Sequence, residues 1–328
     1  MTASFVDLVD LASERLGAAA VAANDEFFAA KENLVKSTAP VWREGEYTER
    51  GKWMDGWETR RRRDPGPDAH DWCLIRLGAR GIVRGVDIDT ANFKGNFPES
   101  CAIDACDLAG PAALDELTGA TWRQILPRTA LAGDTHNLMA VESGTAVTHL
   151  RLRIFPDGGV ARLRVHGDVV ADWPLLRRQG DVDLAAVEHG GLVVACSDMF
   201  FGSRHNLIMP GDATHMGDGW ETKRRRGPGH DWTIIRLGAE GTVRRVTIDT
   251  RHFKGNAPGA CSLEGLRAAN GADLADQAWR ELMTRTPLQP HARHAFEELH
   301  AIGDVTHVRF NIFPDGGVGR LRIYGRPK

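Results

Sequence analysis

Two short segments of the sequence each combine a carboxylate with a run of basic side chains. The candidate residues are Glu58, Arg60 and Arg61 within residues 55–63, and Glu221, Lys223 and Arg224 within residues 218–226. Arginine presents a planar fork that matches a carboxylate, so the basic residues are candidates for binding a substrate acid group. The two glutamates are candidates for proton transfer. The competing interpretation is a pair of solvated surface loops.

A histidine followed by an aspartate comes shortly after each of these segments, as His70-Asp71 and His230-Asp231. An imidazole beside a carboxylate can transfer protons near neutral pH, although a hydrogen-bonding role at the start of a strand would need the same pair. No His-x-His or His-Glu-x-x-His spacing accompanies them, so a divalent metal ion would need ligands from several loops. We therefore assign no cofactor with certainty; a divalent metal ion is possible but unsupported by this spacing, and its site is left unknown.

A third candidate group lies in the motif Phe-Lys-Gly-Asn, which occurs at residues 93–96 and again at 253–256. Lys94, Asn96, Lys254 and Asn256 would present ammonium and amide groups on a glycine-containing loop, which suits substrate binding. A turn with no role in binding is an equally good interpretation of the same residues.

These candidates occur in pairs because the chain contains two copies of one module. Residues 70–90 and 230–250 match without a gap and are identical at 15 of 21 positions, and residues 148–167 match 306–325 at 14 of 20. The domain boundaries predicted from the repeat are 1–168 for the first repeat, with an N-terminal helix and a β-sandwich, 169–190 for a linker, and 191–328 for the second repeat. Each copy is long enough to have its own core.

The hydrophobic pattern predicts an all-β fold in each repeat. Residues 86–90 and 150–154 alternate apolar and polar side chains with the period of a half-buried strand. Pro156-Asp157-Gly158-Gly159 predicts a hairpin that joins residues 150–154 to 162–166. The pattern therefore predicts one antiparallel β-sandwich per repeat. The motif Asp-Trp-x-x-Ile-Arg-Leu-Gly-Ala followed by Val-x-Ile-Asp-Thr resembles the strand pair of discoidin or galactose-binding-like jelly rolls, which implies two tandem jelly-roll β-sandwiches of that type, with short helical insertions. The expected insertions lie within residues 108–126 and 263–283.

Composition restricts the class of partner. The net charge of -3 gives no overall attraction for nucleic acid, and no apolar run approaches the roughly 20 residues that span a bilayer, so we expect neither a nucleic-acid nor a membrane partner. The five cysteines are odd in number and include no Cys-x-x-Cys pair, and the N-terminal residues lack the pattern of a signal peptide. We expect reduced thiols, a cytoplasmic location and a small-molecule substrate; homo-oligomerisation stays open.

Five ordered motifs occur in both copies: Asp-Gly-Trp-Glu-Thr, His-Asp-Trp, Ile-Asp-Thr, Phe-Lys-Gly-Asn and Phe-Pro-Asp-Gly-Gly-Val. Together they resemble the allantoicase family over nearly the whole chain. The resemblance implies a hydrolase of ureido C–N bonds that converts allantoate to ureidoglycolate and urea in purine and allantoin degradation. On that basis His70 or His230, with Glu58 or Glu221, would share the proton transfers, and the basic and amide residues would bind allantoate.

The main alternative is a non-catalytic, lectin-like small-molecule-binding protein, because discoidin-like jelly rolls also serve as binding modules. It predicts binding without turnover. The sequence leaves open which repeat is catalytic. The two copies differ at Asn92 and His252, and at Lys52 and His215, so we expect any division of labour to involve these positions.

Overall fold

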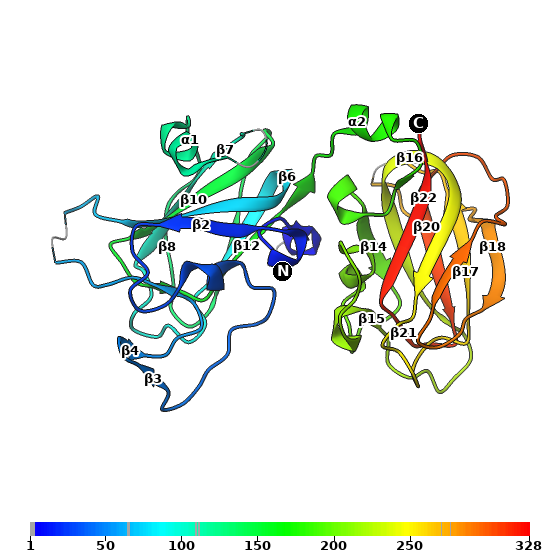
Figure 1. Cartoon of the computed structure of the whole chain (residues 1–328), viewed down its shortest axis with the longest axis horizontal. Coiled ribbons are helices and arrows are strands. Elements are labelled where there is room, and N and C mark those ends of the chain that lie inside the picture. The colour runs from blue at the N-terminus through cyan, green and yellow to red at the C-terminus, as the bar shows by residue number, and fades with distance from the viewer. Residues whose placement is uncertain (1–3, 64–65, 109, 111, 270, 276) are drawn as a thin grey trace. The chain divides into compact units, whose positions relative to one another are not determined.

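The protein folds into two compact units, residues 1–170 and 171–328. The computed structural model describes residues 4–63, 66–108, 110, 112–269, 271–275 and 277–328. Figure 1 shows that each unit is built mainly of strands, with a few short helices at its margins. No helix in the described ranges is long and apolar enough to cross a membrane.

The first unit contains twelve strands among its described residues. They are β1 (Val9–Asp10), β2 (Ala19–Ala23), β3 (Tyr47–Thr48), β4 (Gly51–Lys52), β5 (Trp57–Glu58), β6 (Asp71–Asp89), β7 (Ser100–Cys106), β8 (Arg123–Ala130), β9 (His136–Ala140), β10 (Val147–Phe155), β11 (Gly159–Val160) and β12 (Arg162–Val169). The helices are the 3-10 helices η1 (Ser4–Asp7), η2 (Glu14–Leu16) and η3 (Lys31–Val35), and the α-helix α1 (Leu114–Gly119).

The long strand β6 builds the sandwich because its two halves belong to different layers. Its first half pairs with β2 and β10, and β10 continues the layer through β7 to β8. Its second half pairs with β9 and β12, and β12 pairs with β1. Between the halves lies Gly78, where a side chain would come within 2.7 Å of the Leu16 carbonyl oxygen. Glycine therefore allows the N-terminal segment to pack against the bend.

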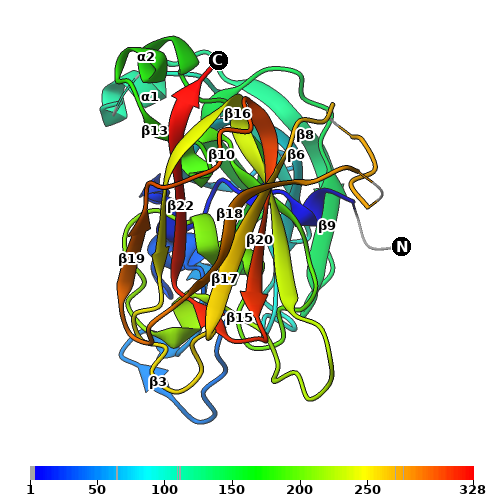
Figure 2. The same ribbon diagram turned by 90° about the vertical axis from the view of Figure 1, so that its right-hand side faces the viewer.

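The second unit repeats this arrangement. Its strands are β13 (Val182–Asp183), β14 (Leu192–Cys196), β15 (Trp220–Glu221), β16 (Asp231–Asp249), β17 (Ala260–Leu266), β18 (Arg280–Pro287), β19 (Arg293–Phe296), β20 (Val305–Phe313), β21 (Gly317–Val318) and β22 (Arg320–Pro327). Its helices are α2 (Trp173–Arg178) and the 3-10 helices η4 (Val187–His189), η5 (Arg204–Ile208) and η6 (Met216–Asp218). Figure 2 shows β17, β18 and β20 side by side in this unit.

The apolar positions of the predicted strands form the core. Val86 and Ile88 of β6 and Leu152 and Ile154 of β10 are fully buried in one cluster of the first unit. Alternating strand residues point to opposite faces, so these side chains point between the layers and the residues adjacent to them in the strand point to the other face. The all-β, two-sandwich fold predicted from the sequence is confirmed.

The predicted hairpin at residues 156–159 is wrong. β10 pairs with the first half of β6 and β12 with the second half, so the intervening loop crosses from one layer to the other. The chain is diverted because β11 pairs with β5. Gly158 has φ 140° and packs so closely against the backbone of residues 96–98 that a Cβ would lie 2.7 Å from the Pro98 nitrogen. The paired glycines thus allow this loop to pack closely against a neighbouring loop, and they do not form the turn of a two-stranded hairpin.

Three shorter segments also differ from the sequence expectations. The predicted N-terminal helix is limited to the 3-10 turns η1 and η2, separated by strand β1. The predicted linker is largely structured, because Asp172 caps α2 and β13 pairs with β22. The helix predicted within residues 108–126 is present as α1. The helix predicted within residues 263–283 is absent from the described residues of that segment, whose ends belong to strands β17 and β18.

Candidate active site

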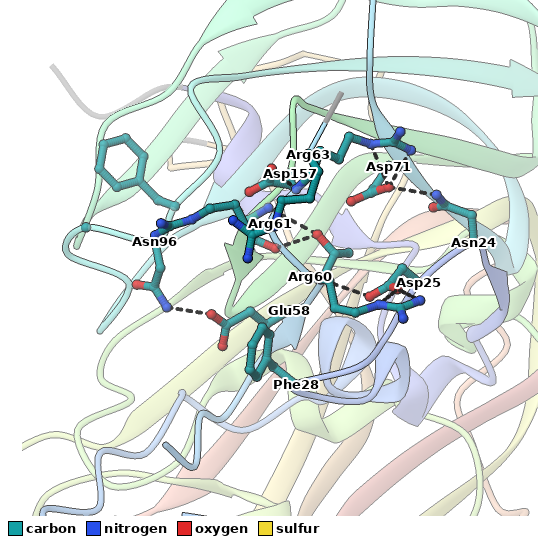
Figure 3. Close-up of a pocket in the computed structure, with 15 residues that line it drawn as sticks. Asn24, Asp25, Phe28, Glu58, Arg60, Arg61, Arg63, Asp71, Asn96 and Asp157 are labelled. Atoms are coloured by element: carbon teal, nitrogen blue, oxygen red, sulfur yellow. Dashed lines mark hydrogen bonds and ion pairs between the residues drawn. The ribbon is translucent and has the colours of Figure 1, made fainter. Parts of the chain in front are cut away.

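A pocket of about 900 Å³ in the first unit collects most of the sequence candidates of that repeat. It is lined by Asn24, Asp25, Phe28, Glu58, Thr59, Arg60, Arg61, Arg62, Arg63, Asp71, Gly95, Asn96, Phe97, Asp157 and Gly158. Figure 3 shows Glu58, the arginines and Asn96 around one space. Four loops therefore meet here: the segment after β2, the segment after β5, the Asn96 loop and the loop between β10 and β11.

Strand β5 fixes the acidic and basic segment against the sandwich. Trp57 is fully buried, and its indole N–H donates to the Asp25 carbonyl oxygen at 2.8 Å. The Thr59 N–H donates to the Gly158 carbonyl oxygen at 3.1 Å. Trp57 thus fixes the start of the segment in the core, and Thr59 fixes its middle to the loop that crosses between the layers. Glu58 and the arginines therefore lie along the pocket wall.

Glu58 forms a carboxylate–amide pair with Asn96. The Asn96 side-chain nitrogen donates to Glu58 Oε1 at 2.8 Å. Burial raises the pKa of the Glu58 carboxyl, and the hydrogen bond from Asn96 offsets only part of this rise. A carboxyl group with a raised pKa retains its proton to a higher pH, which suits it to general acid–base chemistry.

Two of the four arginines are already neutralised by carboxylates. The Arg60 Nε donates to Asp25 Oδ2 at 2.6 Å, and Arg62 Nη2 donates to Asp71 Oδ1 at 2.8 Å. Burial opposes ionisation of Asp25, but hydrogen bonds from backbone N–H groups and from Arg60 hold its pKa below the usual range. Arg61, by contrast, is exposed and has no hydrogen bond or ion pair to any other described residue.

Arg63 resembles Arg61 in having no described partner, so the pocket has two uncompensated guanidinium groups. Asp71 is almost fully buried and also accepts a hydrogen bond from the Asn24 amide at 2.7 Å. Its second oxygen, Oδ2, has no hydrogen-bond partner among the described residues. Asp71 therefore holds Arg62 and Asn24 in place at the back of the pocket.

The structure does not bring the His70 ring into this group. Its Nδ1 lies 2.8 Å from the Asp68 carbonyl oxygen, and the ring packs against Phe155 at 5.3 Å between centroids. The His70 carbonyl oxygen, however, accepts a hydrogen bond from Arg62 at 2.7 Å. Lys94 is exposed and borders an adjoining cavity of about 490 Å³ that also reaches Glu58 and Asn96.

Three residues of the pocket were missed by the sequence reasoning: Asn24, Asp25 and Asp157. A signal for Asp25 was present, because Asp-x-Phe-Phe occurs at residues 25–28 and again at 198–201. Asp157 lies in the repeated Phe-Pro-Asp-Gly-Gly motif, and its carboxylate accepts a hydrogen bond from the Arg62 N–H at 2.8 Å. Motif repetition could have identified Asp25 and Asp157 but not Asn24, whose counterpart is Ser197, and the repeat alone does not indicate which space these residues line.

The second unit has a smaller pocket of about 390 Å³ at the corresponding place. It is lined by Ser197, Asp198, Lys223, Arg224, Arg225, Arg226, Gly227 and Asp231. Arg225 Nη2 donates to Asp231 Oδ1 at 2.5 Å, and Lys223 Nζ lies 3.6 Å from Asp198 Oδ2. The acid–base pairs of the first pocket are thus reproduced.

The remaining candidates of the second repeat lie outside that pocket, as far as the described residues go. Glu221 accepts a hydrogen bond from the Asn256 amide at 2.6 Å, which matches the pair in the first unit. His230 packs on Phe313 at 4.6 Å between ring centroids and lies within 3.2 Å of Asn311 Oδ1. Lys254 is exposed.

The described residues contain no group of three or more His, Cys, Asp or Glu side chains arranged to hold a metal ion.

Comparison with known proteins gives one consistent family. The family model of the allantoicase repeat matches residues 9–170 and 182–328. The chain is 48% identical over 331 residues to a probable allantoicase of Pseudomonas paraeruginosa, covering 99% of this chain and 98% of the relative. It is 49% identical to probable allantoicase 2 of Burkholderia pseudomallei, covering 97% and 94%. The crystal structure of allantoicase from Saccharomyces cerevisiae superposes with a TM-score of 0.82 at 35% identity, covering 97% and 92%.

Proposed function

The chain belongs to the allantoicase family and is a hydrolase of allantoate, and we propose that its reaction takes place in the pocket of the first unit. Its products are ureidoglycolate and urea. The observation that carries the proposal is the half-buried Glu58, with its raised pKa, in the same pocket as the unpartnered Arg61. This combination supplies a proton-transfer group and an anion-binding group to one ligand.

Substrate binding is assigned to the uncompensated arginines. Allantoate has one carboxylate and two ureido groups on a single carbon. Arg60 and Arg62 are engaged by Asp25 and Asp71, whereas Arg61 and Arg63 have no partner among the described residues. We assign bidentate binding of the substrate carboxylate to Arg61. The side-chain oxygen Oδ1 of Asn96 can accept a hydrogen bond from a ureido N–H, while its side-chain nitrogen donates to Glu58.

The reaction requires cleavage of the bond between the central carbon and one ureido nitrogen. Protonated Glu58 donates its proton to the departing nitrogen, and the lone pair of the retained ureido nitrogen forms a C=N bond as urea leaves. Water then adds to the central carbon and gives a proton back to the Glu58 carboxylate. One water is consumed and the protons balance, so a single carboxyl group can serve as acid and then as base.

The discriminating experiment is to compare Glu58→Gln with Glu221→Gln while urea and ureidoglycolate are assayed. We expect Glu58→Gln to lower kcat by about 10²–10⁴-fold, which is the usual contribution of a general acid–base group. Glu221→Gln is expected to retain most of the turnover. A near-native kcat in Glu58→Gln would exclude the proposed site.

Thermal unfolding of Glu58→Gln distinguishes a loss of catalysis from a loss of folding. Because the folded-state pKa of Glu58 is raised, its ionised form is disfavoured in the folded protein, and stability is lost as pH rises through that pKa. Glu58→Gln removes this ionisation, so its thermal unfolding at neutral pH should occur no lower than that of the wild type. The lectin-like alternative, in contrast, predicts that no variant changes turnover because none occurs.

We also propose a cytoplasmic location for this activity. The five cysteines are all free, and four of them are buried. Unpaired thiols are typical of proteins kept in a reducing compartment.

A further inference from the structure

We propose that the pocket of the second unit is a second, non-hydrolysing binding site for a small α-ureido carboxylate, the chemical class of the substrate and product. The inference rests on the proposed function only for the identity of that class.

The second pocket has a larger excess of basic over acidic side chains than the first. Four basic residues line each pocket, but they face four carboxylates in the first unit and only two, Asp198 and Asp231, in the second. Lys223 and Arg225 are engaged by those two carboxylates. The second pocket therefore has a net positive charge, which favours a bound anion.

The uncompensated charge in the second pocket comes from Arg224 and Arg226. Both side chains are exposed, and neither has a hydrogen bond or ion pair with another described residue. Asp231, which is almost fully buried, orients the neighbouring Arg225 between them, together with a hydrogen bond from the Arg225 N–H to Asp315 at 2.7 Å. Two free guanidinium groups flanking a fixed one can bind a carboxylate and a ureido oxygen.

What the second pocket lacks is the proton-transfer group. Glu221 keeps its amide partner Asn256 but is not among the described residues that line this pocket, whereas Glu58 lines the first. The two carboxylates that do line it, Asp198 and Asp231, are paired with Lys223 and Arg225. A ligand held by Arg224 and Arg226 therefore has no unengaged carboxyl group of this lining beside its C–N bond. The site can bind the anion without cleaving it.

The two pockets differ because the second unit lacks a covering hairpin. In the first unit, the segment between η3 and β5, residues 36–56, contains the hairpin β3–β4. Gly51 of β4 packs against the Phe28 ring, because a Cβ placed on this glycine would lie 3.3 Å from a ring carbon of Phe28. The corresponding segment, residues 209–219, is too short for it. Phe201, the counterpart of Phe28, is therefore 62% exposed and does not wall the pocket.

The test uses N-carbamoylglycine, a stable α-ureido carboxylate that has no second ureido group to be expelled. Titration calorimetry of the full-length protein should give two molecules bound per chain, and the double variant Arg224→Ala/Arg226→Ala should bind one. Arg244→Ala, which removes an exposed arginine of the same unit outside the pocket, is the matched control and should still bind two. The neutral amide of the same compound should not occupy the second site.

A single site in the wild type, or two sites that persist in the double variant, would overturn the inference. Turnover of allantoate by the wild type and by Glu58→Gln is measured in parallel. Because N-carbamoylglycine is not hydrolysed, the number of sites is counted whether or not Glu58 proves catalytic, so failure of the catalytic assignment is distinguished from failure of the second site.

Discussion

At the scale of single residues, the protonation state of Glu58 controls the proposed reaction. The carboxyl group must be protonated to donate to the departing nitrogen, so activity is expected to fall as pH rises through its pKa. Burial raises that pKa and the Asn96 hydrogen bond lowers it. The balance between these two effects sets the upper pH limit of turnover.

Asn96→Ala should move this limit to higher pH. Loss of the hydrogen bond removes the effect that lowers the Glu58 pKa, so the protonated form persists further toward neutrality. The measurement is the pH dependence of kcat, with Asn256→Ala as the matched variant of the second unit, in which we expect no shift. A shift of the Asn96→Ala profile to lower pH would contradict the assigned proton donor.

The histidines give a second prediction at this scale. The His70 ring contacts Phe155 and a backbone carbonyl group, and the His230 ring contacts Phe313; among the described residues, neither histidine lines the pocket of its own unit. His70→Ala and His230→Ala should each keep kcat within about tenfold of the wild type, below the contribution of a general acid–base group. A loss comparable to that of Glu58→Gln would return His70 to the reaction.

At the scale of elements, the start of β12 positions the loop that carries Glu58. Arg162 is fully buried, and its guanidinium donates to Asp55 Oδ2 at 2.8 Å and to the Asp55 carbonyl oxygen at 3.0 Å. Arg320 makes the same contacts with Asp218 in the second unit. These arginines connect β12 to the segment before β5 in the first unit, and β22 to the segment before β15 in the second.

Arg162→Met should therefore reduce both stability and turnover. It leaves the buried Asp55 without its main partner, which typically costs about 3–5 kcal/mol, and it releases the segment that presents Glu58. Arg320→Met should cost a similar amount of stability in the second unit but leave the kcat of the folded fraction close to the wild-type value. The measurements are denaturant unfolding and kcat under native conditions; equal losses of kcat in both variants would show that the two loops are functionally coupled.

At the scale of the whole molecule, each unit has its own core and its own copy of the strand network. Leu163 and Leu321 occupy equivalent positions in β12 and β22, and both are fully buried. This identical pair allows the stability of each unit to be changed separately.

Leu163→Ala and Leu321→Ala are each expected to destabilise their own unit by about 2–5 kcal/mol through lost burial and the cavity left behind. Differential scanning calorimetry should show a shifted transition in each variant, and saturating N-carbamoylglycine should protect the first unit of Leu321→Ala because the pocket at Arg61 is intact. If both substitutions abolish turnover at a temperature where the first unit remains folded, the units do not act independently.

The duplication, the all-β class and the family resemblance could be predicted from the sequence, because apolar alternation and repeated loop motifs are visible in the order of residues. The motifs around Glu58, Asp71 and Asn96 were recognisable for that reason. Even the carboxylate at Asp25 had a detectable signal, the repeated Asp-x-Phe-Phe.

Which candidate side chains lie together in one pocket could be learned only from the tertiary fold. Residues 156–159 look like a hairpin locally, but competing pairing with the two halves of β6 carries them across the sandwich to bring Asp157 to Arg62. Similarly, Arg60 and Arg61 are neighbours with equal side chains, and only the approach of Asp25 neutralises one and leaves the other free. Such pairings depend on contacts between residues far apart in the chain, which neither composition nor spacing records.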